Sequence, residues 1–209
     1  MTRDLRELHR RAGAEADRVI GAIHLDDLGR PTPCAGWDVR TLLNHLVNGN
    51  VRFTAIVTGA DVPDRDAPVL GEDPLGAFRS TLADLIEVFD RDGALDGLYA
   101  TPVGEERGAQ LIATRVIELL VHSGDLSRAT GQPGGLDPDL CARCLDILRG
   151  RSLPRGEGRP FAAEQPAPEG APAAEALAAF AGRLPTAQCG DVDVKVKEDR
   201  RRAGATASP

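Results

Sequence analysis

Apolar residues in the first part of the chain recur with the spacing of an α-helix. Between residues 3 and 28 they return every three or four positions, as Leu5, Leu8, Ala12, Ala16, Val19, Ile20 and Ile23. This spacing is close to the 3.6-residue period of an amphipathic helix and predicts a first helix there. The segment GRPTPCAGW (29–37) then breaks the pattern with two prolines and two glycines, which predicts that the helix has ended.

Three further long helices are expected. Asp38, a good N-cap, precedes an apolar-periodic run that ends near Gly59. After a loop with three prolines, PLGAFRSTLADLIEVFDR predicts a helix from about 74 to 91. A fourth helix is expected from about 108 to 130, where ATGQPGG stops it. The connection before it, DGALDGLYATPVGEERG, contains one candidate extended piece, LYATPV.

The second half of the chain predicts shorter elements. Aspartates around LDPDL start a fifth helix, CARCLDILRG, and AAEALAAFAGR (173–183) predicts a sixth, with an irregular tract over 151–175 between them. The expected fold class is therefore all-α, a four-helix bundle with additional short C-terminal helices. We assign residues 1–187 to this bundle and 188–209 to a polar, flexible tail.

Composition narrows the class of protein. Of the 209 residues 42% are hydrophobic but only 3% aromatic, so the core must be aliphatic. A net charge of -7 argues against a nucleic-acid-binding surface, which needs a basic face. The N-terminus is too charged for a signal peptide, and no stretch approaches the roughly 20 apolar residues of a membrane helix. We therefore expect a cytoplasmic protein whose cysteines are free thiols.

Two of the predicted helices carry metal-ligating side chains on one stripe. In ELLVHSGDL (118–126), Glu118 and His122 are four residues apart and so share a helix face. The same stripe of the fourth helix includes Leu111, Thr114, Arg115 and Asp125. On the second helix, His45 shares a stripe with Asp38, Thr41, Asn48, Gly49 and Arg52. Both stripes are either solvent-facing polar surfaces or walls of one shared cavity.

If the two stripes face each other, two imidazoles and a carboxylate form a three-ligand set. Such a set suits catalytic zinc, which keeps a fourth position open for water or substrate. Iron in a facial triad uses the same ligand types, so the residues do not fix the metal. An E-x-x-x-H spacing alone is common by chance, which leaves the solvent-facing interpretation open.

Three stretches resemble one known family. PTPCAGWDVRTLLNHLV (31–47), VIELLVHSGDLSRATGQP (116–133) and GRPFAAEQPAPEGAPAAEALAAFAGRLP (158–185) are similar to segments of the mycothiol-dependent maleylpyruvate isomerase N-terminal domain family. That family belongs to the DinB-like superfamily of metal-binding four-helix bundles. By position, the resemblance implies that His45, Glu118 and His122 are the metal ligands.

The resemblance also implies a cofactor, a co-substrate and a source. The metal would be a divalent ion, Zn2+ first, with Fe2+ or Ni2+ as alternatives, and mycothiol would be a co-substrate. With the arginine-, alanine- and glycine-rich composition, it implies an actinobacterial origin. There are two departures: Gly124 stands where the family motif has a tryptophan, and the full isomerase carries a second C-terminal domain for which this chain has no room.

Several other residues have two interpretations. Arg52 and Arg115 either receive a carboxylate of the thiol or substrate, or are solvated surface arginines, the reading that we favour. Asp125 either orients a metal-bound histidine or is an ordinary polar residue of the helix end. We interpret Trp37 as a packing anchor and Cys34 as a small buried residue.

The remaining candidates are weaker. Cys141 and Cys144 lack two further ligands for a structural zinc site, and a redox dithiol is the alternative. His9 and His24 are predicted to be surface histidines.

Three functions remain open. The protein is a metal-dependent thiol transferase or isomerase acting on a small electrophile, a metal-dependent hydrolase on the same bundle, or a non-catalytic metal-binding ligand or regulatory module. Members of such bundle families commonly pair through exposed helix faces, so a homodimer stays open for all three.

Overall fold

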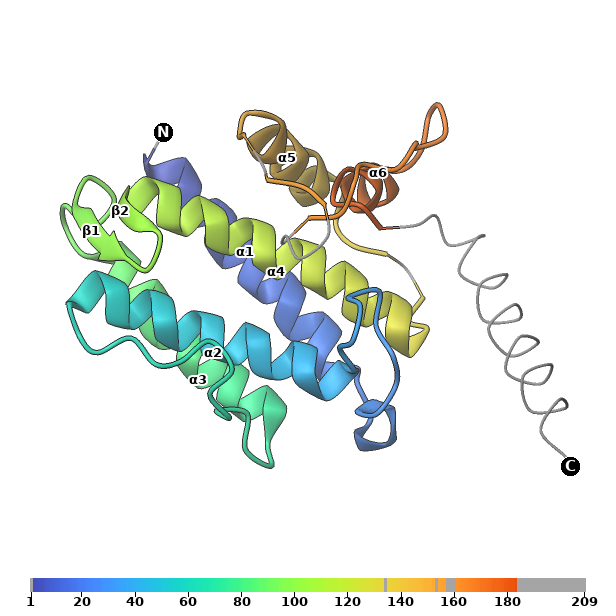
Figure 1. Ribbon diagram of the computed structural model, residues 1–209, viewed down its shortest axis with the longest axis horizontal. Helices are drawn as coiled ribbons and strands as arrows, with labels where there is room; N and C mark the ends of the chain where they lie inside the picture. Colours follow the sequence, from blue (N-terminus) through green and yellow to red (C-terminus); the bar gives the residue numbers. More distant parts are fainter. Residues whose placement is uncertain (1, 134, 153, 157–160, 184–209) are drawn as a thin grey trace, which may run out of the picture.

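Four long helices form the body of the molecule in the computed structural model, which describes residues 2–133, 135–152, 154–156 and 161–183. They are α1 (Thr2–Gly21), α2 (Val39–Thr58), α3 (Pro74–Asp90) and α4 (Gly108–Thr130). Helix α1 packs against α3 and α4, and α2 packs against the same two helices, which closes a four-helix bundle (Figure 1). The all-α prediction is confirmed. The predicted tail, 188–209, and Cys189 lie outside the described residues.

Polar caps set the helix boundaries. The side chain of Asp38 accepts a hydrogen bond from the Thr41 backbone N–H at 2.8 Å, and that of Asp73 accepts one from Gly76 at 2.9 Å. Each bond satisfies a donor that the first turn of a helix leaves without a partner. Helix α2 ends at Gly59, whose φ of 74° is a left-handed conformation that glycine adopts without strain. These local signals explain why the predicted starts of α2 and α3 are confirmed.

Other boundaries differ from the predictions. Helix α1 ends earlier than predicted and a short 3-10 helix, η1 (Leu25–Asp27), follows it. The predicted extended piece is one half of an antiparallel hairpin, β1 (Leu98–Thr101) with β2 (Gly104–Arg107). Helix α5 (Pro138–Arg149) begins one turn earlier than CARCLDILRG, because Asp137 caps it, and α6 (Ala173–Phe180) ends before residue 183.

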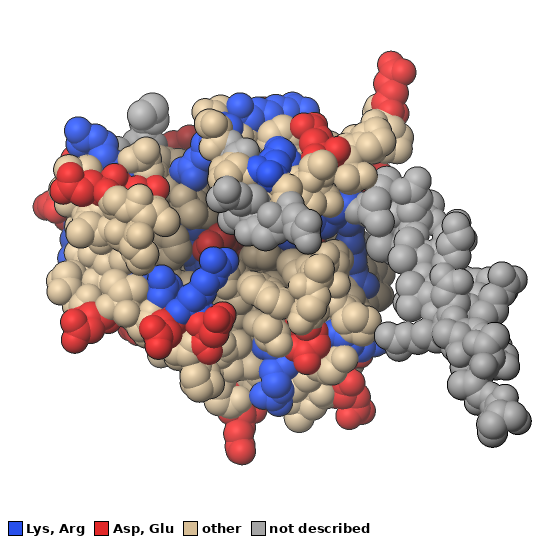
Figure 2. Space-filling model, in the orientation of Figure 1, with Lys and Arg blue, Asp and Glu red and all other residues tan. Residues whose placement is uncertain are grey.

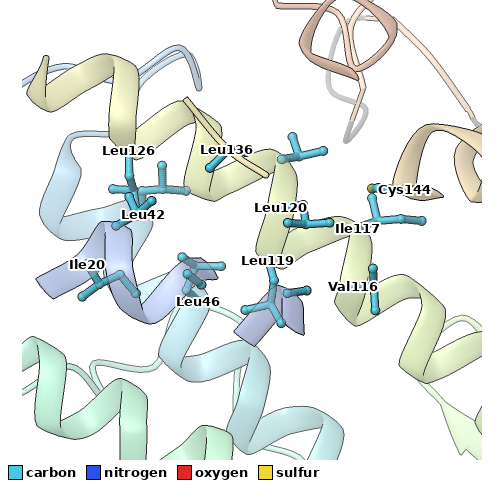
Figure 3. Close-up of a cluster of buried hydrophobic side chains, with 14 of the residues drawn as sticks. Ile20, Leu42, Leu46, Val116, Ile117, Leu119, Leu120, Leu126, Leu136 and Cys144 are labelled. Carbon is cyan, nitrogen blue, oxygen red and sulfur yellow. The ribbon is translucent and has the colours of Figure 1, made fainter. Parts of the chain in front are cut away.

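The interior is aliphatic, as the composition predicts. Side chains of α1, α2 and α4 meet in one cluster, where Leu42 and Leu46 of α2 lie beside Leu119 and Leu126 of α4 (Figure 3). Cys144 of α5 joins the same cluster and is completely buried. Burial of this apolar surface is the main source of the stability of such a bundle.

Helix α4 is the central element. It contacts α1 and α2 within the bundle, and α5 and α6 pack against its other side (Figure 1). A helix surrounded in this way has little surface left for solvent, so polar residues along it must find partners inside the protein.

The outer surface shown in Figure 2 carries acidic and basic side chains interspersed over the same face. None of the described helices combines the length and the apolar character that crossing a membrane requires.

Candidate metal centre

The polar stripes of α2 and α4 face each other. The imidazole rings of His45 and His122 lie in edge contact, with centroids 5.1 Å apart and planes at 88°. The indole of Trp37, from the segment that leads into α2, lies 5.0 Å from the His45 ring and 6.4 Å from the His122 ring. Two histidines from separate helices therefore meet beside one half-buried aromatic ring. Trp37 packs against both of them, as the packing-anchor interpretation predicts.

Arg115 is completely buried, so the prediction of a solvated arginine is wrong. Its Nε donates to Asn50 Oδ1 at 2.9 Å, its Nη2 to the Leu46 carbonyl at 2.5 Å, and its Nη1 to Glu118 Oε2 at 2.9 Å. The guanidinium also lies against Gly49, and it occupies the space that a Cβ atom on residue 49 would need. Because Arg115 is completely buried and each of its three nitrogens donates to a group inside the protein, it does not serve as a receptor for a substrate carboxylate.

The ion pair with Arg115 keeps Glu118 charged. Burial alone raises the pKa of this carboxyl, but the adjacent Arg115 charge and its hydrogen bond lower it, and the net pKa lies below its usual value. The Glu118 side chain is 27% exposed and its second oxygen, Oε1, has no hydrogen bond in the described structure. Glu118 is thus an ionised carboxylate with one oxygen held and one oxygen left to bind a cation.

Asp125 is almost completely buried and accepts hydrogen bonds from two directions. Its Oδ2 lies 3.0 Å from His122 Nδ1, and Arg183 donates to both of its oxygens, at 3.0 and 2.7 Å. Although burial raises the pKa of Asp125, the bonds from His122 and Arg183 hold it well below its usual range. An ionised carboxylate only accepts, so Nδ1 of His122 must carry the proton. The ring nitrogen of His122 that Asp125 leaves without a partner is then Nε2.

Cys34 completes this network. Its thiol lies 3.3 Å from Asp125 Oδ2 and 3.8 Å from His122 Nδ1. Among the described side chains, Cys34, His122 and Asp125 form the group of three ligand atoms that lie within 4.8 Å of one another. Burial, together with the Asp125 charge, raises the pKa of the thiol to about 12, and the thiol donates its hydrogen to Asp125. With the Arg183 guanidinium also bound to Asp125, we interpret this group as a hydrogen-bond network.

His45 is a neutral imidazole in this environment. Its pKa is lowered to about 3, and burial is the largest cause. A neutral imidazole has a free lone pair, which is the form that binds metals. His45 and His122 therefore lie on facing stripes, and Glu118 shares the α4 stripe as an ionised carboxylate. Ligation itself stays a prediction.

Arg52 has a partner in the loop after α2. It shares a stripe of α2 with His45, but its guanidinium binds the carbonyl of Pro63 and holds the loop after α2. It therefore has a partner inside the protein and is not a solvated surface arginine.

Cys141, Cys144 and His9 are buried in the interior of the protein. Cys141 and Cys144 are free and completely buried, and burial raises the pKa of each thiol to about 12. Neither is a reactive thiolate at neutral pH. The surface prediction for His9 is wrong, because its side chain is 1% exposed and packs edge-on against Phe89, 5.5 Å away. His24 is exposed, as predicted.

Three contributors were not predicted from the sequence: Gly49, Asn50 and Arg183. The first two accommodate a guanidinium from another helix, and no local pattern indicates that. Arg183 did leave a signal, because it belongs to the GRLP stretch that the family resemblance includes. Its contact with Asp125, 58 residues earlier, is a property of the fold.

Sequence comparison relates this chain to known proteins. The sequence profile of the mycothiol maleylpyruvate isomerase N-terminal domain matches residues 9–127. Two uncharacterized proteins of Mycobacterium tuberculosis, Rv0738 and MT0763, are each 34% identical over 177 residues, which is 84% of this chain and 95% of theirs.

Solved structures show the same fold. The crystal structures of a mycothiol-dependent maleylpyruvate isomerase and of a histidine-to-alanine mutant of it superpose with TM-scores of 0.57. Each superposition covers 74% of this chain and 75% of the isomerase chain, at 16% sequence identity.

The fold is thus an all-α bundle like that in the crystal structures of a mycothiol-dependent maleylpyruvate isomerase. More particularly, this chain belongs to the mycothiol maleylpyruvate isomerase N-terminal domain family.

Proposed function

We propose that this protein is a divalent-metal-dependent enzyme that activates a low-molecular-weight thiol, mycothiol, for S-transfer to, or isomerisation of, a small electrophile. The proposed ligands are His45, Glu118 and His122, and the proposed metal is Zn2+. The observation that carries the proposal is the edge contact of His45 with His122, at 5.1 Å, across the interface between α2 and α4. Membership of a family named for mycothiol-dependent isomerisation supports the choice of a thiol.

The residues fit a catalytic zinc site. Two imidazoles and one carboxylate are three protein ligands of the kinds that zinc prefers, and three ligands leave one position open. Asp125 holds Nδ1 of His122, which leaves Nε2 as its donor atom, and Arg115 holds one oxygen of Glu118. Hydrogen bonds of this kind orient ligands and are a regular part of protein metal sites.

A bound Zn2+ ion would supply a lowered pKa for a thiol or water in its open position. The protein's own residues define where that position opens. Trp37 covers one side of the two imidazoles, whereas Glu118 keeps part of its side chain exposed. Access from solvent is therefore expected along the Glu118 side, which is where the thiol and the electrophile would enter.

The first test is metal binding. Wild-type protein treated with a chelator should bind about one equivalent of Zn2+ or Co2+ in calorimetric titration. His122→Ala should lose most of this affinity, because it removes one of three ligands. His24→Ala is the matched control, since it removes an exposed histidine outside the site. Unchanged metal binding by His122→Ala would contradict the proposed centre.

The second test addresses the thiol. Metal-loaded protein is incubated with mycothiol and a panel of small electrophiles that includes maleylpyruvate, and products are followed by mass spectrometry and ultraviolet absorbance. We expect a thiol adduct or an isomerised product that disappears in the metal-free protein and in His122→Ala. Turnover of esters or amides without thiol would instead identify a hydrolase. Metal binding without turnover of any substrate in the panel would contradict the enzymatic proposal and support a binding module.

A further inference from the structure

The end of the described chain reaches back to the α4 helix. Arg183, three residues after α6, has a side chain that is 9% exposed. Its Nε and Nη2 donate to the two oxygens of Asp125, at 3.0 and 2.7 Å, and its Nη1 donates to the Ala181 carbonyl at 2.8 Å. Nη2 also lies 3.5 Å from the Cys34 sulfur. This paired geometry fixes both the position and the rotation of the Asp125 carboxylate.

The fixed carboxylate in turn fixes His122. Asp125 Oδ2 accepts from His122 Nδ1 at 3.0 Å, so a chain of contacts runs from Arg183 through Asp125 to the imidazole. Asp125 is nearly inaccessible to water, and a buried carboxylate without a positive partner is strongly disfavoured. Removal of Arg183 would therefore free the Asp125 carboxylate to turn, and His122 would lose the acceptor that orients its ring.

We propose that Arg183 is a positioning residue of the metal centre, so that the C-terminal segment 161–183 completes a site whose ligands come from α2 and α4. The inference rests on the proposed function, because it assumes that Nε2 of His122 binds the metal. It adds that the affinity of the centre depends on a side chain that contacts neither the metal nor the substrate.

A different arginine anchors the same segment. Arg155 Nη1 donates to the carbonyls of Ala162 and Phe180, at 3.1 and 2.6 Å, and its guanidinium lies 4.5 Å from the centre of the Phe180 ring. Leu177 and Ala181 are buried in the core beneath it. Arg155 thus attaches the segment without touching Asp125 and provides a matched control for the structural contribution.

The test compares three variants of the full chain in Co2+ binding. Arg183→Gln should weaken Co2+ binding by about 10- to 100-fold and alter the visible absorption spectrum of the bound ion, as expected when a hydrogen bond behind a histidine ligand is lost. Arg183→Lys, which keeps the charge but not the paired geometry, should fall between wild type and Arg183→Gln. Arg155→Gln should lower the melting temperature and leave both the affinity and the spectrum unchanged.

The outcomes separate the two proposals. Wild-type protein that binds no Co2+ or Zn2+ contradicts the proposed function and this inference with it. Wild-type binding with an unchanged affinity and spectrum in Arg183→Gln contradicts the inference alone, as does an equal loss in Arg155→Gln. If Arg183→Gln does not fold, as judged by circular dichroism, the Arg183→Lys spectrum decides: an unchanged spectrum and affinity would overturn the inference.

Discussion

At the scale of single residues, the site is built from charges that are buried in pairs. Arg115 places a guanidinium against the proposed ligand Glu118, and Arg183 places one against Asp125, which contacts the proposed ligand His122. Periodicity placed Glu118 and His122 on one face of α4, but it did not show whether that face meets water. The partners that decide the question come from far along the chain: Asn50 lies 65 residues before Arg115, and Arg183 lies 58 residues after Asp125.

Gly49 shows how a residue of one helix depends on a side chain of another helix. An added Cβ would overlap the guanidinium of Arg115, so we expect Gly49→Ala to destabilise the protein by about 1–3 kcal/mol, as overpacking usually does. Alanine otherwise favours a helix interior over glycine, so a loss of stability would identify the clash. The measurement is urea unfolding followed by circular dichroism.

Two comparisons isolate the clash at Gly49. Gly124→Ala, in the middle of α4, meets only Leu136 at an ordinary 3.6 Å and should be neutral or slightly stabilising. In a double-mutant cycle with Arg115→Met, the cost of Gly49→Ala should shrink, because the atoms that it overlaps are gone. An equal cost in both backgrounds would show that Gly49 serves another purpose.

At the scale of elements, sequence signals within one helical turn predict where the long helices lie, but they do not predict a strand that forms only by pairing with another strand. Helix α2 begins after Asp38 and ends before Gly59, as the sequence predicts, because caps act within one turn. The second strand, Gly104–Arg107, has the sequence GEER and no alternation of apolar residues. It is a strand because the turn after Thr101 brings it beside β1. Contacts of that kind are absent from a pattern read along one segment.

The cap of α2 gives a prediction at this scale. Asp38→Ala removes the acceptor for the Thr41 N–H and should reduce the free energy of unfolding by about 0.5–2 kcal/mol. Asp38→Asn keeps a side-chain oxygen in the same place and should retain most of the stability. Chemical denaturation of both variants tests this; equal losses would mean that the charge of Asp38, rather than its hydrogen bond, stabilises the helix start.

At the scale of the whole molecule, α1 shows why surface predictions fail in a closed bundle. A helix packed on one side hides a narrow stripe, but α1 packs against both α3 and α4. Its buried surface is therefore wide enough to include His9 beside Leu8 and Ala12. His9 faces Phe89 from α3 and the charge of Arg115 from α4, and its Nε2 atom has no hydrogen-bond partner among the described residues. A charged imidazole has nothing there to stabilise it.

This burial makes the stability of the bundle depend on pH. Burial first, and then the Arg115 and Arg10 charges, lower the pKa of His9 to about 3, from about 6.5 in an unfolded chain. Between about pH 6.5 and 3, His9 therefore binds a proton in the unfolded state but not in the folded state. The stability associated with neutral His9 is fully present above pH 6.5 and is lost as pH falls from about 6.5 towards 3, by about 1.4 kcal/mol per unit.

The test is a difference between variants, because other groups also titrate at low pH. Urea unfolding of metal-free wild type and His9→Phe is measured between pH 7.5 and 4.5. The difference in free energy of unfolding should move in favour of His9→Phe by about 1.4 kcal/mol for each unit below pH 6.5. His24→Phe, at an exposed position, is the control and should follow wild type. A constant difference between His9→Phe and wild type would mean that His9 gains solvent or a proton acceptor in the folded protein, which would contradict its placement between α3 and α4.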